Sequence, residues 1–454
     1  MPNQAACQTK SEKPAGTAVP ESDDTVAKLP TWQKWTILFV VCWMTLPATF
    51  ASSSIMTAVA EVATDFDVPT HVITTANAGV FIAMAVSALI WLPISTIIGR
   101  RPTYLLATIM LTLSSVGSVT SQSFAFFVTA WVLGGATGFY FLIAGQTILA
   151  DTFEPTSRGL AVGLFLGSSV AANSLAPMIG GVLVSYTTWR IICVIQAGMA
   201  FSGLALGYLF IPNTVGCDNQ QAKGRSSDDY VMGVLRKFSP LDVFRLFKNP
   251  NIIMADFACG LLGFNQYALI ASVRRVINPR FNLTTLLISG LLYLAPGAGF
   301  LLGSMIGGAL SDRLRLPQDR LNASLPAFFF LLPLGTLVFG WSLQLEVGGM
   351  ALPVISSFVQ GFGLMWSFSG LNTYAAEVVP EKRTAVISGK YIIQYCFGAV
   401  AVGGVVPMID AIGVGWAFTI TGLGATLAMI KKTLHVQSQK TIDDKLDDDG
   451  DSFV

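Results

Sequence analysis

The stretch "WLPISTIIGRRPTYLL", residues 91–106, is apolar as far as Ile98 and then breaks on Gly99 and the pair Arg100 and Arg101. Apolar residues continue on both sides of the break for about twenty positions, the length that an α-helix needs to cross the roughly 30 Å core of a bilayer. The whole chain is 53% hydrophobic and only 12% charged, whereas about a quarter of the residues in soluble domains are charged. The sequence therefore predicts a polytopic membrane protein in which this break is a tight turn at the membrane surface.

Apolar windows of this length recur along the chain and predict twelve transmembrane helices. They cover residues 36–57, 74–97, 103–121, 125–149, 160–184, 190–211, 251–273, 285–310, 322–343, 349–371, 385–408 and 412–430. The fold class that follows is an all-α polytopic membrane protein, because helices satisfy their own backbone hydrogen bonds within lipid.

The positions of the 27 lysines and arginines predict the orientation, because cytoplasmic loops of membrane proteins are enriched in cations. With the N-terminus inside, the cations that face outwards are Arg190, Arg274, Arg275 and Arg280, and the others are cytoplasmic. We therefore expect both termini in the cytoplasm.

The sequence also contains an approximate internal repeat. "ISTI" at 94–97 corresponds to "LSDR" at 310–313, and "LADTFEPTSR" at 149–158 corresponds to "AAEVVPEKR" at 375–383. Repeated six-helix halves are typical of transporters whose substrate binds between the halves near the membrane midplane. The expected segments are a disordered tail at 1–34, a six-helix bundle at 35–211, a cytoplasmic loop at 212–250, a second six-helix bundle at 251–430 and an acidic tail at 431–454.

The arginine pair resembles the loop between helices 2 and 3 of the major facilitator superfamily, whose pattern is approximately G-x-L-S-D-R-x-G-R-R. Gly99, Arg100 and Arg101 fit the pattern, whereas Leu92 and Thr96 stand where it has its first glycine and its acid. The resemblance implies a latch whose charges pair in one conformation and separate in the other. An interpretation of the arginines as positive-inside anchors is compatible with this. The latch residues are Gly99, Arg100, Arg101, Asp151, Arg158, Asp312, Arg313 and Glu377.

"GLFLGSSVAANSLAPMIGGVLV", residues 163–184, resembles the antiporter signature of the same superfamily, which ends in G-P-x-x-G-G. Pro177, Gly180 and Gly181 match it, and a gate role and simple tight packing both explain them. Small residues recur at four-residue spacing at Gly163 and Gly167 and again at Gly299, Gly303 and Gly307.

With "VVPMIDAIGVGWAFTI" at 405–420, the chain is similar to the fungal twelve-helix drug:proton antiporter branch, which includes quinidine and multidrug resistance exporters. The resemblance implies two pseudo-symmetric six-helix bundles and efflux of small organic compounds across the plasma membrane.

Polar residues inside membrane helices are candidates for substrate binding, because burying them against lipid is costly. Some are expected only to bond neighbouring helices. The candidates are Asn77, Gln146, Asn173, Gln196, Asn265, Gln266, Gln360, Asn372, Tyr391 and Gln394.

Two charged residues lie inside predicted spans. Lys390 shares a helix face with Gln394, and if it faces a cavity it predicts a carboxylate substrate. Snorkelling of Lys390 to the headgroups is the alternative. Asp256 is the candidate for proton coupling. Antiporters of the resembled family commonly pair an acid in helix 1 or 4 with an arginine, and here Trp131 occupies the arginine position. Coupling through Asp256 and uncoupled export therefore both remain open.

Enzyme chemistry finds little support, because the six cysteines lack metal-site spacing and the two histidines are His71 and His435. We predict no metal and no cofactor.

The predicted function is that of a monomeric, lipid-embedded exporter of a small organic molecule, with an organic acid or secondary metabolite favoured and no nucleic-acid partner. The alternatives are a polyspecific proton-driven drug or cation pump and a non-transporting receptor or sensor.

Asn282 begins a sequon and is a candidate glycosylation site.

Overall fold

The computed structural model describes residues 30–154, 157–211, 247, 249–277, 280–281, 290–313, 321–378, 383–424 and 426. Every regular element in these ranges is a helix, as predicted. Most of the predicted central loop and of both predicted tails lies outside the described residues, and so does Asn282.

The helices follow one another in the order that the apolar windows predicted. The first half contains α1 (Thr31–Ser54), η1 (Ile55–Thr57), α2 (Val59–Asp65), α3 (Thr70–Ile98), α4 (Arg100–Thr120), α5 (Phe124–Thr152), α6 (Arg158–Tyr186) and α7 (Arg190–Phe210). The second half contains α11 (Pro250–Ser272), the π-helix η3 (Val273–Ile277), α14 (Leu294–Asp312), the π-helix η4 (Ala327–Leu331), α16 (Leu332–Leu345), α17 (Ala351–Val378) and α18 (Arg383–Ile412). Among the described residues 11 helices are long and apolar enough to cross a membrane, and a shorter apolar helix, Val414–Gly424, begins the predicted twelfth span.

The short helix α2 is an element that the apolar windows do not predict. It is held by its last residue, Asp65, whose Oδ2 accepts hydrogen bonds from Arg190 Nη1 at 2.6 Å and from Trp189 Nε1 at 3.1 Å. These partners lie at the start of α7, more than one hundred residues further along the chain. The helix is therefore fixed by tertiary contacts rather than by its own length.

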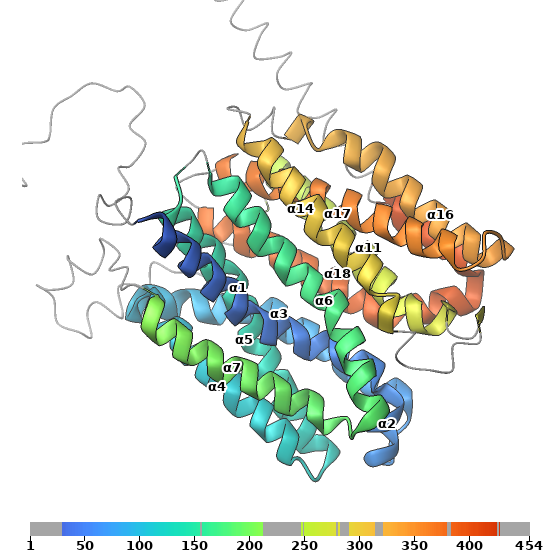
Figure 1. Ribbon diagram of the computed structural model, residues 1–454, viewed down its shortest axis with the longest axis horizontal. Helices are drawn as coiled ribbons and strands as arrows, with labels where there is room; N and C mark the ends of the chain where they lie inside the picture. The colour runs from blue at the N-terminus through green and yellow to red at the C-terminus, as the bar shows by residue number, and fades with distance from the viewer. Residues whose placement is uncertain are drawn as a thin grey trace, which may run out of the picture.

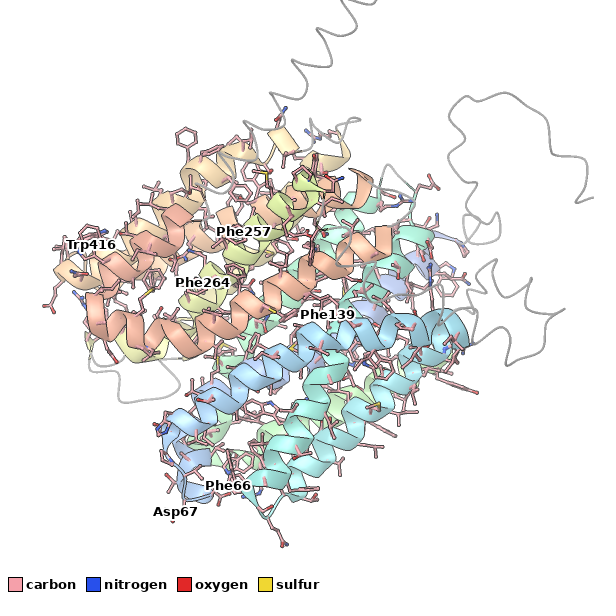
Figure 2. All side chains as sticks on the ribbon, turned by 180° about the vertical axis from the view of Figure 1, so that it is seen from behind. Phe66, Asp67, Phe139, Phe257, Phe264 and Trp416 are labelled. Carbon is pink, nitrogen blue, oxygen red and sulfur yellow. The ribbon has the colours of Figure 1, made fainter. Side chains whose placement is uncertain are left out.

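The helices form two groups, which follow each other in the colour order of Figure 1 from blue-green to yellow-red. The most extensive contacts between the groups are those of α6 with α14 in Figure 1 and of α3 with α18 in the opposite view of Figure 2, and α5 also touches α18. We call the end of the molecule where α3 meets α4 the Arg100 end. The distribution of lysines and arginines in the sequence predicts that this end is cytoplasmic.

Helix α14 is packed closely on two faces. On the first face, Gly299, Gly303 and Gly307 lie against the backbone of α17, and a Cβ at Gly307 would be 3.0 Å from the Cα of Trp366. The four-residue spacing of these glycines therefore produces the close helix packing that small residues permit. Because this contact lies within the second half, it does not need to change when the halves move.

The second face of α14 forms the contact between the halves. A Cβ at Gly308 would be 2.6 Å from the carbonyl oxygen of Gly159, and a Cβ at Gly163 would be 2.8 Å from the carbonyl oxygen of Ser304. The Ser304 hydroxyl also donates a hydrogen bond to the carbonyl oxygen of Gly163. The backbones of α6 and α14 therefore touch near the Arg100 end, where bulkier residues would hold the halves apart.

Candidate functional site

Most buried hydroxyls in the described helices are satisfied by their own helix. Thr45 donates to the carbonyl oxygen of Val41 at 2.8 Å, and Thr108 donates to that of Tyr104 at 2.8 Å. Amide, ammonium and carboxylate groups are too large or too strongly polar to be satisfied in this way, so they need partners on other helices. These groups therefore indicate where polar chemistry is concentrated.

One cluster of such groups joins the two halves. Lys390 Nζ on α18 donates to Asn372 Oδ1 on α17, and Asn372 Nδ2 donates to Gln146 Oε1 on α5 at 3.4 Å. Gln146 Nε2 in turn donates to the Tyr391 hydroxyl. We call Lys390, Asn372, Gln146 and Tyr391 the Lys390 cluster. Its members belong to both halves of the chain, as a site between the halves requires.

Aromatic rings surround the ammonium group of Lys390. Nζ lies 3.8 Å from the centroid of the Tyr391 ring and 4.9 Å from that of Phe368. Phe139 of α5, which Figure 2 shows beside the contact between the halves, meets Tyr391 edge to face at 4.9 Å. Lys390 is fully buried, so water does not solvate its charge. The ring faces and the amide oxygen of Asn372 stabilise the charge in place of water. In this conformation Lys390 does not snorkel to the surface.

Asp256 lies on α11, next to the helix that carries Lys390. A Cβ placed on Gly389 would be 3.5 Å from Asp256 Oδ2, and the carboxyl group interacts electrostatically with Lys390. Asp256 and Lys390 are the two charged residues that are fully buried among the described residues. The carboxylate and the ammonium that the sequence singled out separately therefore belong to one site.

The depth of this site follows from the helix positions. Lys390 is seven residues after the start of α18, Asp256 is six after the start of α11, and Gln146 and Asn372 are each six before the ends of their helices. At a rise of about 1.5 Å per residue, all four lie about 10 Å from the helix ends at the Arg100 end. The Lys390 cluster is thus level with the contact between α6 and α14.

Other predicted binding residues lie in a separate network. Gln360 Nε2 donates to Asn265 Oδ1 at 2.8 Å, and Asn265 Nδ2 donates to the hydroxyls of Thr336 and Thr421 at 3.4 Å each. All four residues belong to the second half. This network ties four helices of one bundle together and shares no hydrogen bond with the Lys390 cluster.

The remaining polar candidates are buried but are not brought together. Asn173 Oδ1 accepts a hydrogen bond from Ser53 at 2.7 Å, which links α6 to α1 within the first half. Gln394 packs against Gly263 of α11. The candidates that are buried outside both the Lys390 cluster and the Asn265 network are Asn77, Asn173, Gln196, Gln266 and Gln394.

An ion pair at the Arg100 end joins two of the predicted latch residues. Gly99 adopts φ 101°, which favours glycine, and it is the single residue between the end of α3 and the start of α4. This turn places Arg100 Nη1 against Asp151 Oδ2 at the end of α5. Arg101 donates to the carbonyl oxygen of Tyr208. The pairing has the geometry that a latch needs, and the latch role itself stays a prediction.

The other latch residues are less informative. Arg158 donates to the carbonyl oxygen of Phe153 at 3.4 Å, and Arg313 is exposed just after α14. The side chains of Asp312 and Glu377 lie outside the described residues. The second copy of the latch therefore stays a prediction.

The proline and glycines predicted as a gate lie inside α6 and are buried. A Cβ at Gly180 would be 2.8 Å from Thr57 Oγ1 and 2.9 Å from the carbonyl oxygen of Ser54. Gly180 therefore packs against α1 and η1 of its own half. Other residues of α6 make the contact between the halves along the whole helix: Gly159, Gly163 and Gly167 near its start, and Ser174 and Met178, which lie against Gly297 and Gly290, further along.

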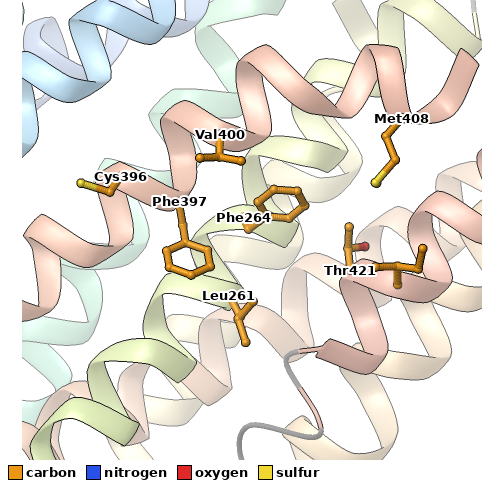
Figure 3. A pocket seen from close by; sticks show the side chains of 8 residues that line it. Leu261, Phe264, Cys396, Phe397, Val400, Met408 and Thr421 are labelled. Carbon is orange, nitrogen blue, oxygen red and sulfur yellow. The ribbon is translucent and has the colours of Figure 1, made fainter. Parts of the chain in front are cut away.

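A hollow on the outer surface of the second half is shown in Figure 3 and has a volume of about 310 Å³. It is lined by Leu261, Phe264, Cys396, Phe397, Val400, Met408, Ile420 and Thr421. Because this lining is apolar except for Thr421, and because Val400 and Ile420 are exposed, the hollow is suited to contact with lipid. It contains no member of the Lys390 cluster.

Within the described residues, no three His, Cys, Asp or Glu side chains come together as a metal site would need.

Phe139, Phe368 and Ser304 are not among the site residues predicted from the sequence. Phe368 is four residues before Asn372 and Phe139 is seven before Gln146, so helical spacing places each on the face of a predicted polar residue. That spacing is the signal that identifies them. Ser304 has no comparable signal, because its role depends on the helix that packs against it.

Known proteins resemble the chain over most of its length. The sequence profile of the Major Facilitator Superfamily matches residues 41–403. The efflux pump FUBT of Fusarium oxysporum is 24% identical over 434 residues, which cover 88% of this chain and 72% of that protein. The MFS antiporter QDR3 of Candida albicans is 20% identical, over 88% of this chain and 77% of that protein. A structure of the proton:xylose symporter XylE has a TM-score of 0.66 at 16% identity and covers 88% of this chain and 95% of that one.

Proposed function

Because the chain belongs to the major facilitator superfamily and is a multi-pass membrane transporter, we propose that it exports a small organic acid, whose carboxylate binds Lys390. The observation that carries the proposal is the fully buried ammonium of Lys390, held between α5, α17 and α18 at the contact of the two halves. Relatives named as efflux pumps support the outward direction.

The chemistry of the Lys390 cluster favours an anion. An ammonium group has three donors, and the one hydrogen bond described for it goes to the neutral amide oxygen of Asn372. A carboxylate would add an opposite charge to this bond, and the Coulomb attraction between the two charges is strong away from water. The rings of Tyr391, Phe368 and Phe139 supply apolar surface beside this anchor, so an aromatic acid fits best.

A second candidate is proton-driven export of drugs or organic cations. It is favoured by Asp256, which is fully buried, and by the same rings, whose faces attract cations. In that case Lys390 would be the internal counter-ion of Asp256. A third candidate, a receptor that binds ligand without transporting it, differs from both in its lack of flux.

The experiment that separates these candidates is flux in proteoliposomes. Vesicles carrying the purified protein are loaded with labelled p-aminohippurate, an aromatic carboxylate, or with labelled tetraphenylphosphonium. Charge-assisted hydrogen bonds contribute about 1.5–3 kcal/mol, so Lys390→Met should lower p-aminohippurate flux about 10- to 150-fold. The matched variant Lys390→Arg keeps the charge and should retain part of the flux.

Two results would contradict the proposal. Transport of tetraphenylphosphonium but not of p-aminohippurate would make the protein a cation exporter. Binding of p-aminohippurate without flux would make it a receptor.

A further inference from the structure

A second hollow lies at the Arg100 end, apart from the Lys390 cluster and from the hollow of Figure 3. Its volume is about 310 Å³, and the beginnings of α1 and α4 and the end of α7 enclose it. In Figure 1, α4 and α7 lie on the side of the first half that faces away from the second half. The hollow therefore borders the surrounding membrane and not the contact between the halves. The residues that line it are Trp32, Gln33, Thr36, Ile37, Arg101, Leu209, Phe210 and Ile211.

The lining of this hollow carries a positive charge. Among the described residues that line it, Arg101 is charged and none is acidic. The acids at and just after the end of α5 have other partners, since Asp151 pairs with Arg100 and Glu154 lies 3.5 Å from Lys34. The ligand that complements the hollow is therefore an anion.

The guanidinium group of Arg101 is held in position. Its Nη2 donates to the carbonyl oxygen of Tyr208, and its Cζ lies 5.6 Å from the centroid of the Tyr208 ring. A guanidinium has five donors in a planar fork that fits the oxygens of a phosphate, and the bond to Tyr208 uses one of them. Arg101 can therefore bind phosphate oxygens while it stays in contact with α7.

The apolar side chains around the hollow are exposed. The exposed fractions are 62% for Trp32, 70% for Leu209 and 43% for Phe210. Tryptophan is typical of the interface between membrane and water. Exposed apolar surface of this kind is stabilised by contact with acyl chains, whereas a soluble phosphate would leave it uncovered. The surroundings of Arg101 therefore favour a lipid over a free phosphate.

From this combination of features we propose that the hollow binds an anionic phospholipid of the cytoplasmic leaflet. The phosphate of the lipid contacts Arg101, and its acyl chains lie against Leu209 and Phe210. The cytoplasmic leaflet is rich in anionic lipids, and the distribution of lysines and arginines predicts that the Arg100 end faces it. The bound lipid touches α1, α4 and α7, so it ties helices of the first half together whichever substrate the protein exports.

The test is native mass spectrometry of the purified full-length protein in detergent, with equal amounts of phosphatidylserine and phosphatidylcholine that carry the same acyl chains. One cation near the membrane surface favours an anionic lipid about fivefold, so the wild type should bind phosphatidylserine about five times more often. Arg101→Gln should remove this preference, and Arg101→Lys, which keeps the charge, should retain part of it. The matched control Arg313→Gln removes an exposed cation at the same end but outside the hollow and should keep the preference.

Three results would overturn the inference. The first is a wild type that shows no preference for phosphatidylserine, and the second is an Arg313→Gln variant that loses as much of it as Arg101→Gln. The third is displacement of the lipid by an equal concentration of glycerophosphoserine, which has the same phosphate without acyl chains and would make this a site for soluble phosphates.

A measurement on the wild type decides the matter even if Arg101→Gln does not fold. A photoreactive phosphatidylserine should label residues 208–211, and excess phosphatidylserine should suppress this labelling more than phosphatidylcholine does. Equal suppression by the two lipids would also contradict the proposal.

Discussion

Replacing Gly308 with alanine should open the Arg100 end without damaging either half. The new Cβ would lie 2.6 Å from the carbonyl oxygen of Gly159, and ordinary contact begins at 3.4 Å, so α6 and α14 must separate by about 0.8 Å (3.4 − 2.6). Overpacking of this kind costs about 1–3 kcal/mol. We call the conformation in which α6 and α14 touch at this end closed, and the one in which they are apart open. A cost of about 2 kcal/mol that falls only on the closed conformation would shift the ratio of closed to open molecules about 30-fold towards open.

Spin labels at Ser157 and Arg313, two exposed positions beside α6 and α14 at this end, would report the shift as a longer distance between the halves. The matched control is Gly303→Ala on the same helix, whose Cβ meets the backbone of Phe362 within one half. It should lower the melting temperature and leave the label distances unchanged. An unchanged distance distribution in Gly308→Ala, or an equal shift in Gly303→Ala, would show that the contact of Gly308 with Gly159 does not hold this end closed.

Three further predictions concern the polar networks. Asn265→Leu should lower the free energy of unfolding by about 1–3 kcal/mol, because Gln360 loses its acceptor, and thermal melts should show this while Lys390-dependent flux persists. Tyr391→Phe should keep p-aminohippurate binding, because phenylalanine keeps the ring above Lys390. Tyr391→Leu removes the ring and should weaken binding about 2- to 30-fold. Equal affinities of the two variants would exclude a role for the ring. A double-mutant cycle of Arg100→Gln and Asp151→Asn should give a coupling of less than about 1 kcal/mol in stability, because the side chains are 41% and 44% exposed and water screens the pair. Either change alone should slow flux if the pair is a latch.

The helices could be predicted from the sequence because each apolar window is a local property of the chain. Their ends were less well predicted, since α3 begins at Thr70 and α17 continues to Val378, beyond the apolar windows. Polar turns extend a helix without changing the apolar signal that marks the span. Helix α2 was missed because it depends on the contact between Asp65 and Arg190.

The members of the site could be predicted individually but not as a group. Gln146 and Asn265 are alike in the sequence, since each is an amide within an apolar helix. In the structure, Gln146 bonds across the two halves and Asn265 bonds within one half. The sequence shows the cost of burying each amide, but the partner depends on how distant helices pack. The association of Asp256 with Lys390 is likewise set by the contact between α11 and α18.

The Lys390 cluster also connects binding to the contact between the halves. Asn372 accepts from Lys390 and donates to Gln146, so one side chain takes part in both the anion anchor and the bridge between halves. A carboxylate that replaces Asn372 on Lys390 would leave the amide free to turn and would weaken the hold on Gln146. Besides this bridge, the contact of Ser304 and Gly308 with α6 holds the halves together at the Arg100 end. Spin labels at Ser157 and Arg313 would show whether p-aminohippurate loosens that contact. A substrate that binds Lys390 without shifting these distances would show that anchor and bridge act independently.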